Sequence, residues 1–157
     1  MRLACFFPVV ATLTAGIMTM AAAQSRDSVA CSGVPCVPLA GHVEPGGEIG
    51  LYGYGKWNED CTSAKPPPFV SIKQPAHGTV LLCPEKLPGS DFRKRCTAGT
   101  LDGVRVWYIA DPGFQGFDEF EFRIGNDSRS RYVLYSITVA TGAARSKVQP
   151  TCTQRLS

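Results

Sequence analysis

Hydrophobic and polar residues alternate with a period of two in several stretches of the chain, a pattern typical of β-strands with one buried face. The clearest case is 118–124, where three hydrophobic side chains fall on one side of the strand and three charged side chains on the other. A second run, 131–139, places four hydrophobic residues on one side. These hydrophobic positions are Phe120, Phe122, Ile124, Val133, Tyr135, Ile137 and Val139. Both runs therefore predict strands that cover a core with one face.

Shorter hydrophobic runs predict five more strands, separated by residues that favour turns. They lie at 37–43, 48–54, 69–72, 80–82 and 104–109. The triplet Pro45, Gly46 and Gly47 separates the first two, and three consecutive prolines at 66–68 prevent a helix before the third. Seven short strands over about 100 residues, with no helical periodicity between them, predict an all-β fold, an antiparallel β-sandwich.

The first 23 residues have a different character. A positive start at Arg2 is followed by the almost wholly hydrophobic stretch 3–20 and by the small residues 21–23 that a signal peptidase requires. Residues 1–23 are therefore interpreted as a secretory signal peptide, with a mature chain that begins at Gln24 and is periplasmic or secreted. An uncleaved membrane anchor is the alternative, because residues 3–23 are just long enough to span a bilayer. After cleavage no membrane span is expected.

Six cysteines remain in the mature chain. An even number in an exported protein predicts disulfides rather than metal binding or redox chemistry. We expect Cys83 to pair with Cys96, because the two flank a short loop that contains proline and glycine. Spacing leaves the pairing of the other four open. They are Cys31, Cys36, Cys61 and Cys152.

Two segments resemble the recurring bacterial Ig-like or cadherin-like repeat. Residues 108–122 read Tyr-Ile-Ala-Asp-Pro-Gly-Phe-Gln-Gly-Phe-Asp-Glu-Phe-Glu-Phe, similar to the family pattern Tyr-x-Pro-x-x-Gly-Phe-x-Gly-x-Asp-x-Phe-x-Tyr. Upstream, residues 74–80 read Gln-Pro-Ala-His-Gly-Thr-Val, similar to the Pro-x-His-Gly-Thr-Val turn of that family. The resemblance implies an Ig-like sandwich over about residues 38–140. The sequence departs from the pattern where proline stands at Pro112 instead of near Ala110 and where Phe122 replaces tyrosine.

The resemblance and the alternation together predict a shared core and a division of the chain. The residues expected to be buried together are Phe114, Phe120, Phe122, Ile124, Ile137 and Val139. An extended segment is expected at 24–37, the sandwich at 38–140, and a tail tied by Cys152 at 141–157. Extra residues between Leu82 and Val104 predict an inserted, exposed loop at 83–103, closed by the Cys83–Cys96 disulfide, and such a loop on a rigid scaffold is a common place for function.

Catalytic and metal-binding motifs do not emerge from the sequence. It contains no G-x-S-x-G, H-E-x-x-H or C-x-x-C motif, so no enzyme activity and no cofactor are expected. His77 is interpreted as a turn residue, and Asp118 as a residue that caps a loop rather than a calcium ligand. The net charge of +3, from 16 Lys and Arg against 13 Asp and Glu, argues against a nucleic-acid partner.

Two groups of residues are candidates for partner contacts. The first is the glycine-spaced aromatic group Tyr52, Tyr54 and Trp57, whose rings could stack on sugars or simply cover a core. The second is the set of basic residues in the expected loop: Lys86, Arg93, Lys94 and Arg95. The expected function is that of an exported, non-catalytic binding or structural module with a protein or envelope-polymer partner. A carbohydrate-binding protein that uses exposed aromatics, and a small secreted hydrolase or hydrolase inhibitor, are the alternatives.

Overall fold

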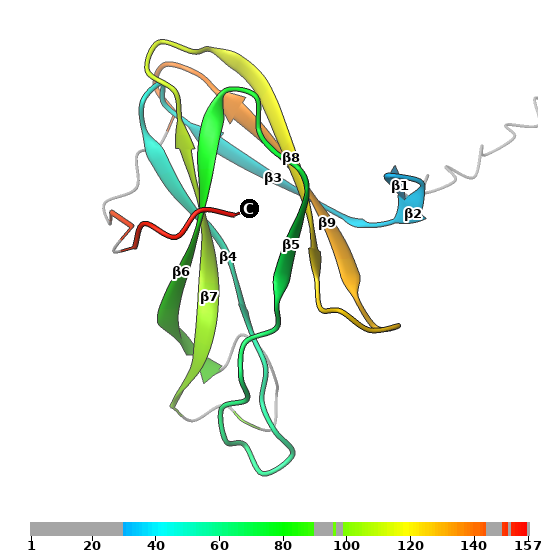
Figure 1. The fold of residues 1–157 in the computed structure, drawn as a ribbon. Helices are drawn as coiled ribbons and strands as arrows, with labels where there is room; N and C mark the ends of the chain where they lie inside the picture. The colour runs from blue at the N-terminus through cyan, green and yellow to red at the C-terminus, as the bar shows by residue number, and fades with distance from the viewer. Residues whose placement is uncertain (1–29, 90–95, 97–98, 144–148, 151, 157) are drawn as a thin grey trace, which may run out of the picture.

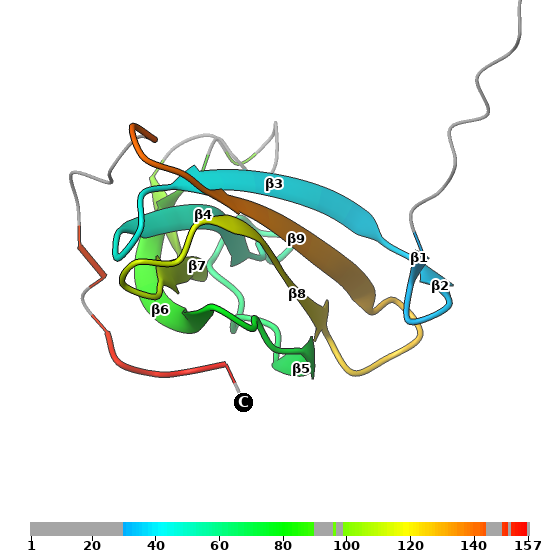
Figure 2. The ribbon, with the colours of Figure 1, turned by 90° about the horizontal axis from the view of Figure 1, so that it is seen from above.

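The computed structural model describes residues 30–89, 96, 99–143, 149–150 and 152–156. These residues form two β-sheets that face each other across one core (Figures 1 and 2). One sheet has the strand order β3-β9-β8-β5 and the other β4-β7-β6. The strands are β3 Val37–Val43, β4 Glu48–Gly55, β5 Phe69–Lys73, β6 Gly78–Pro88, β7 Thr100–Ala110, β8 Gly116–Ile124 and β9 Arg131–Val139. The predicted all-β sandwich of about seven strands is confirmed, and no helix occurs among the described residues.

The first and last strands of the sandwich lie side by side. Every neighbouring pair is antiparallel except β3 and β9, which run parallel from Val37 opposite Val133 to Val43 opposite Val139. In the constant-type immunoglobulin arrangement the first strand instead joins the sheet of the second. Here the consecutive strands β3 and β4 belong to different sheets, and each forms the edge of its sheet on the same side of the molecule.

The core follows the alternation seen in the sequence. Phe120, Phe122 and Ile137 are 0% exposed and Val139 is 1% exposed, as predicted. Phe114 and Ile124 pack against the same cluster and are partly buried. The rings of β8 and β9 stack on one another, with centroids 5.0 Å apart for Phe120 and Tyr135. Burial of these aromatic side chains is the main contribution to the stability of the sandwich.

The outer side of β8 is less exposed than its charged residues suggest. Glu121 is only 5% exposed, although alternation places it on the solvent side of the sheet. A small hairpin formed by β1 (Ala30–Cys31) and β2 (Val34–Pro35) precedes β3, and its Ser32 hydroxyl donates a hydrogen bond to Glu121 Oε2 at 3.3 Å. The extended segment expected at 24–37 thus contains this hairpin in its described part.

Three disulfides join the described cysteines in pairs, and the expected Cys83–Cys96 pairing is wrong. The bonds are Cys31–Cys36, Cys61–Cys96 and Cys83–Cys152. Cys83 lies inside β6, five residues before its end, which corresponds to about 16 Å along a strand. Cys96 lies beyond that end, so the two are too far apart for a disulfide. The three bonds are typical of a protein that folds in an oxidising compartment.

The expected inserted loop at 83–103 is also wrong, because most of it is strand. β6 and β7 pair continuously from Gly78 opposite Ala110 to Pro88 opposite Thr100, which leaves only 89–99 as the connection. Leu82 N–H points away from β7, toward Gln154 O, so the even-numbered residues of β6 face the free edge of the sheet. Pro84 and Pro88 therefore remove N–H groups that β7 does not need, and the strand continues through them.

A second, smaller core fixes the far end of this hairpin. It consists of Trp57, Leu87, Cys96 and Leu101. The Trp57 indole donates a hydrogen bond to Gly89 O at 3.4 Å, and Cys61–Cys96 joins the segment after β4 to the hairpin connection. The hairpin end is thus part of the folded structure, not a loop that the sandwich could lose.

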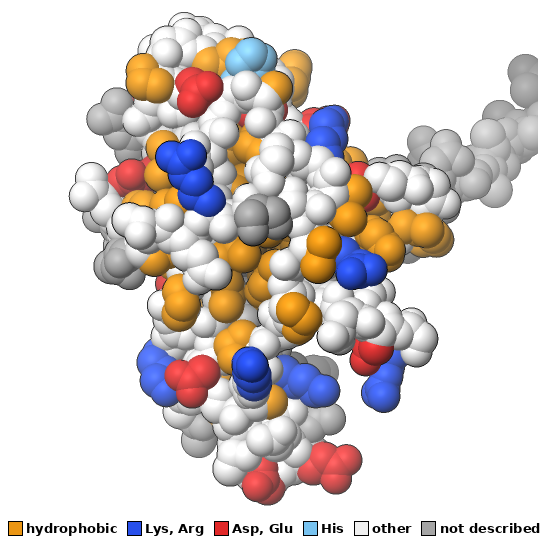
Figure 3. All heavy atoms as spheres, in the orientation of Figure 1, with side chains coloured by type: hydrophobic (Ala, Val, Ile, Leu, Met, Phe, Trp, Pro, Cys, Tyr) orange, Lys and Arg blue, Asp and Glu red, His pale blue; other side chains and the backbone are white. Residues whose placement is uncertain are grey.

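The C-terminal segment adds to the edge of β6 (Figure 1). Leu82 N donates to Gln154 O at 2.9 Å, and Leu156 N donates to Val80 O at 3.0 Å. Leu156 is 4% exposed and belongs to the main core. Figure 3, in the orientation of Figure 1, shows hydrophobic side chains gathered on the face between β6 and β5. Cys152 ties the tail to Cys83 of β6, a partner that the sequence left open, and the tail covers part of this face.

Candidate functional site

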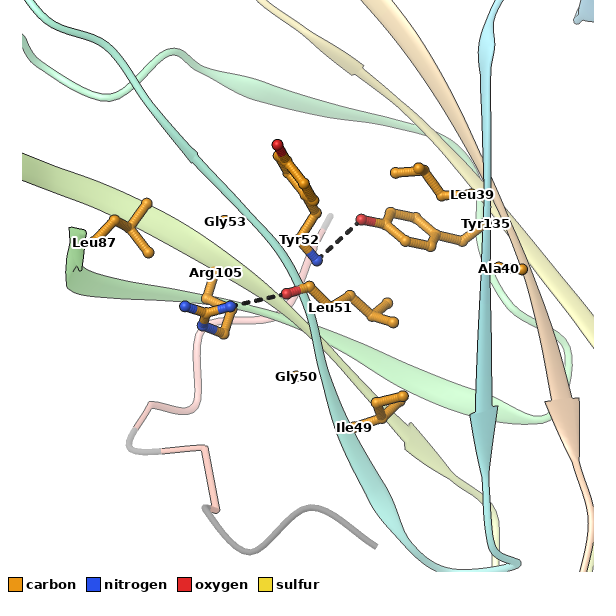
Figure 4. Close-up of a pocket in the computed structure, with 10 residues that line it drawn as sticks. All are labelled: Leu39, Ala40, Ile49, Gly50, Leu51, Tyr52, Gly53, Leu87, Arg105 and Tyr135. Carbon is orange, nitrogen blue, oxygen red and sulfur yellow. Dashed lines mark hydrogen bonds between the residues drawn. The ribbon is translucent and has the colours of Figure 1, made fainter. Parts of the chain in front are cut away.

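A cavity lies on the opposite side of the sandwich, where the edge strands β3 and β4 run next to each other. It has a volume of about 350 Å³ and is drawn in Figure 4. We call it the β3–β4 groove. The residues that line it are Leu39, Ala40, Ile49, Gly50, Leu51, Tyr52, Gly53, Leu87, Arg105 and Tyr135. Both sheets and the β6–β7 hairpin therefore contribute to its wall.

A bulge in β4 shapes the floor of the groove. The pairing of β4 with β7 shifts between Gly50 and Gly53, which releases the backbone of residues 51 and 52 from the β7 ladder. The Tyr52 amide instead donates to the Tyr135 hydroxyl at 3.2 Å, and Leu51 O accepts from Arg105 Nη1 at 3.0 Å (Figure 4). Hydrogen bonds to both sheets therefore hold the bulge in one conformation.

Close packing explains one of the glycines at the bulge. A Cβ on Gly53 would lie 2.7 Å from Leu87 Cδ2, closer than real Cβ atoms approach their neighbours. Leu87 is 1% exposed and belongs to the second core, so it cannot move aside cheaply. Only glycine at position 53 lets β4 lie this close to the hairpin. The wall of the groove at Gly53 therefore consists of main-chain atoms without a side chain.

An ion pair on the outer face of the three-stranded sheet borders the groove. Arg105 Nε donates to Glu85 Oε1 at 2.6 Å, and the two side chains are 30% and 29% exposed. Together with the contact to Leu51 O, this uses two of the five N–H donors of the guanidinium. Glu85 and Leu51 O both hold the Arg105 guanidinium in place. The ion pair has no net charge, and its remaining N–H groups and carboxylate oxygen can bond to solvent.

The predicted aromatic group is divided by the fold. Tyr52 is 55% exposed and stands at the groove, whereas Trp57 is 7% exposed in the second core. Tyr54 packs edge-on against Phe122, with ring centroids 5.9 Å apart, and shares a hydrogen bond with the Tyr135 hydroxyl at 3.2 Å. A platform of three exposed rings is therefore wrong, because β4 turns Tyr54 inward and only Tyr52 remains exposed.

The tyrosine hydroxyls at the groove stay protonated. Burial, reinforced by the neighbouring Tyr135, raises the pKa of Tyr54 far above its usual range. Burial also raises the pKa of Tyr135, although hydrogen bonds from Tyr54 and from the Tyr52 amide oppose this effect. At any physiological pH these groups act as hydrogen-bond donors and acceptors and carry no charge.

Of the four basic candidates, the structure describes only Lys86, and it lies away from the groove. Lys86 forms an ion pair with Asp102 across the hairpin, with Nζ and Oδ1 2.6 Å apart, and both side chains are exposed. Arg93, Lys94 and Arg95 lie outside the described residues. The structure thus places Lys86 in an ordinary exposed pair on the hairpin and does not bring it to the groove lining.

Asp118 has the structural role expected for it. Its carboxylate accepts hydrogen bonds from the backbone amides of Ala76, His77 and Glu119 at 2.9 to 3.0 Å, and from the Tyr108 hydroxyl at 2.9 Å. It therefore fixes the turn before β6. His77 stacks on Phe114 with ring centroids 3.9 Å apart at the end of the sandwich.

Several residues of the groove could not be selected from the sequence. Arg105 and Tyr135 come from strands of different sheets, and only the packing of the two sheets brings them to one cavity, where the β6–β7 register places Glu85 beside Arg105. The glycines spaced within β4 were the one available signal, because glycine inside a strand marks a bulge or a close approach.

Metal and membrane features are not found in the described part of the chain. It holds no group of three or more His, Cys, Asp or Glu side chains placed to bind a metal ion. Within the same residues no helix has the length and hydrophobicity to cross a membrane. In the comparisons with known proteins, no protein-family model and no curated protein matches this chain.

Proposed function

We propose that the protein is an exported, non-catalytic binding module whose ligand occupies the β3–β4 groove. One observation carries this proposal: the exposed ring of Tyr52 and the side chain of Arg105, which Glu85 holds through an ion pair, line the same cavity of about 350 Å³. Ligand sites are typically concave and mostly apolar, with a few well-placed polar groups. The groove has this composition.

The chemistry of the groove favours binding over catalysis. Glu85 is engaged with Arg105, and the hydroxyls of Tyr54 and Tyr135 are engaged with each other. A general base or nucleophile has to be free to accept or attack at the reacting atom. These groups are instead suited to holding a ligand by hydrogen bonds and ring contact.

Export is supported by two independent features. Residues 1–23 have the pattern of a signal peptide, and three disulfides form in the folded chain. A signal peptide directs export and disulfides persist in oxidising compartments, so both features fit the periplasm or the extracellular space. The resemblance to bacterial Ig-like repeats agrees with a module that binds a protein or an envelope polymer.

The test compares retention of cell-envelope material by the immobilised protein and two variants. Tyr52→Ala removes the exposed ring of the groove, and Phe117→Ser removes an 80% exposed ring from the outer side of β8 as a matched control. We expect at least one envelope component to be retained by the parent protein and by Phe117→Ser, and to be lost from Tyr52→Ala. Equal retention by all three proteins, or by none, would refute the assignment of the binding site to this groove.

A further inference from the structure

We infer that the groove takes a neutral saccharide, with one sugar ring stacked on Tyr52 and its hydroxyls held by Arg105 and Glu85. This inference rests on the proposed binding function and specifies its ligand. A cavity of about 350 Å³ lies near the lower end of the range for small-molecule sites, which fits one or two sugar rings and not a larger cofactor.

The polar groups match the hydroxyl group better than an ion. Arg105 contributes donors only, and Glu85 contributes acceptors only, and the two are locked 2.6 Å apart. A hydroxyl donates and accepts, so vicinal sugar hydroxyls satisfy both members of the pair at once. The paired charges of Arg105 and Glu85 attract and repel any ion in nearly equal measure, so an anionic or cationic ligand gains little net electrostatic attraction from the pair.

The aromatic contact suits the face of a sugar ring. Tyr52 is 55% exposed, and its backbone amide is fixed by the hydrogen bond to Tyr135, so the ring stands on a rigid segment. The apolar C–H face of a pyranose can cover such a ring while its hydroxyls point to polar neighbours. Pre-ordering of the bulge means that little conformational entropy is lost on binding.

A peptide strand is a poorer occupant, although two strand edges border the groove. Val43 O faces β9, where it accepts from Ala140 N, so the even-numbered residues of β3 face the free edge. Pro38 has no N–H to offer there, and the Tyr52 amide of β4 is already bonded to Tyr135. Edges blunted by proline and by a bulge resist strand addition. On the other side of the sandwich, the regular β6 edge is the one that a strand-like segment occupies, namely the chain's own 154–156.

The inference is tested by titrating the ¹⁵N-labelled protein with neutral trisaccharides and recording amide chemical shifts. The probes are linear trimers of glucose, mannose, galactose and N-acetylglucosamine, and a trigalacturonate serves as the anionic counterpart. We expect at least one neutral trimer to cause saturable shifts at Tyr52, Gly53 and Arg105, with trigalacturonate binding more weakly.

Two substitutions at one position separate stacking from hydroxyl contacts. Tyr52→Phe keeps the ring and should retain the affinity within about threefold, whereas Tyr52→Ala should weaken it about tenfold or more. Phe117→Ser should bind like the parent. Melting curves of all variants confirm that the fold is kept, which is expected because Tyr52 is half exposed.

The outcomes distinguish this inference from the proposed function. If no neutral trimer shifts the groove amides while envelope retention still depends on Tyr52, the saccharide is refuted and the binding function stands. If retention is also independent of Tyr52, both are refuted. Stronger binding of trigalacturonate than of every neutral trimer, or an affinity that survives Tyr52→Ala, would likewise overturn the neutral-saccharide inference.

Discussion

Replacing Asp118 by asparagine tests whether this buried carboxylate organises one end of the sandwich. Oδ1 accepts from the amides of Ala76 and Glu119, and Oδ2 accepts from the His77 amide and the Tyr108 hydroxyl, all at 2.9 to 3.0 Å. In Asp118→Asn one oxygen becomes an NH₂ group, which faces two donors in either orientation. Each hydrogen bond to a charged group contributes about 1.5 to 3 kcal/mol.

The Tyr108 hydroxyl sets the lower limit of the effect. It also lies 3.1 Å from His77 O, so it can turn toward that carbonyl and avoid the new NH₂ group. The backbone amide cannot turn. The new NH₂ group then faces one backbone amide that has lost its acceptor, at a residue that is only 4% exposed. We therefore expect Asp118→Asn to lower the free energy of unfolding by about 3 kcal/mol at pH 7.

The effect of this substitution depends on pH in a defined direction. Burial alone would raise the pKa of Asp118, but the hydrogen bonds from Ala76, His77, Tyr108 and Glu119 together outweigh it and hold the pKa below its usual value. A carboxylate whose pKa is lower in the folded state stabilises the protein above the unfolded pKa of about 3.9, and this contribution is lost as the pH falls through the folded value. The difference between parent and variant should therefore narrow below about pH 4.

Urea unfolding at pH 7 and pH 3, followed by tryptophan fluorescence, measures this difference. Asp111→Asn is the control, because Asp111 is exposed in the neighbouring turn and should change stability little. A difference below about 1 kcal/mol at pH 7, or one that widens on acidification, would refute the role assigned to Asp118.

Three further predictions use the same unfolding measurement. Glu121→Gln should be neutral or stabilising, because Oε1 of this buried carboxylate has no hydrogen-bond partner among the described residues; a loss as large as that of Asp118→Asn would contradict this. Replacing Cys83 and Cys152 together by serine should lower the free energy of unfolding by about 4 kcal/mol by the chain-entropy model. The tail should then be cut by limited proteolysis, and a tail that stays protected would show that the disulfide does not hold it. Phe120→Ala should cost about 3 to 5 kcal/mol, whereas Phe117→Ser should change stability by less than about 0.5 kcal/mol, and the reverse order would mean that the faces of β8 are exchanged.

The sequence was most informative where one strand could be read without its neighbours. A short hydrophobic run predicted β3 at Val37–Val43, and alternation separated the buried face of β8 from its charged face, because a period of two follows from strand geometry alone. Glu121 is the exception, since its burial depends on a hairpin 89 residues away in the chain. A local pattern contains no information about such a contact.

The wrong predictions, the Cys83–Cys96 disulfide and the loop at 83–103, concern features that depend on which edge of a strand is free. Read without its neighbours, the sequence predicts that Pro84 and Pro88 end the strand, but both face the side of β6 that β7 does not use. The same register places Cys83 near the tail instead of near Cys96, and Arg105 beside Glu85. Tyr52 was a candidate from the sequence, whereas the other groups of the groove were found only when the strands were paired.

The crossed connectivity of two disulfides has a consequence for biogenesis. Cysteines enter an oxidising compartment in the order in which they are synthesised, so Cys61 meets Cys83 before either native partner arrives. The native bonds Cys61–Cys96 and Cys83–Cys152 cannot both form until the chain has been made as far as Cys152, and the core stays open at β6 until Leu156 follows. A bond formed in order of arrival must be broken and exchanged, which takes about minutes to hours without a catalyst. Cells that make this protein in quantity should therefore depend on a disulfide isomerase, and production in a host without one should yield mixtures of mispaired isomers.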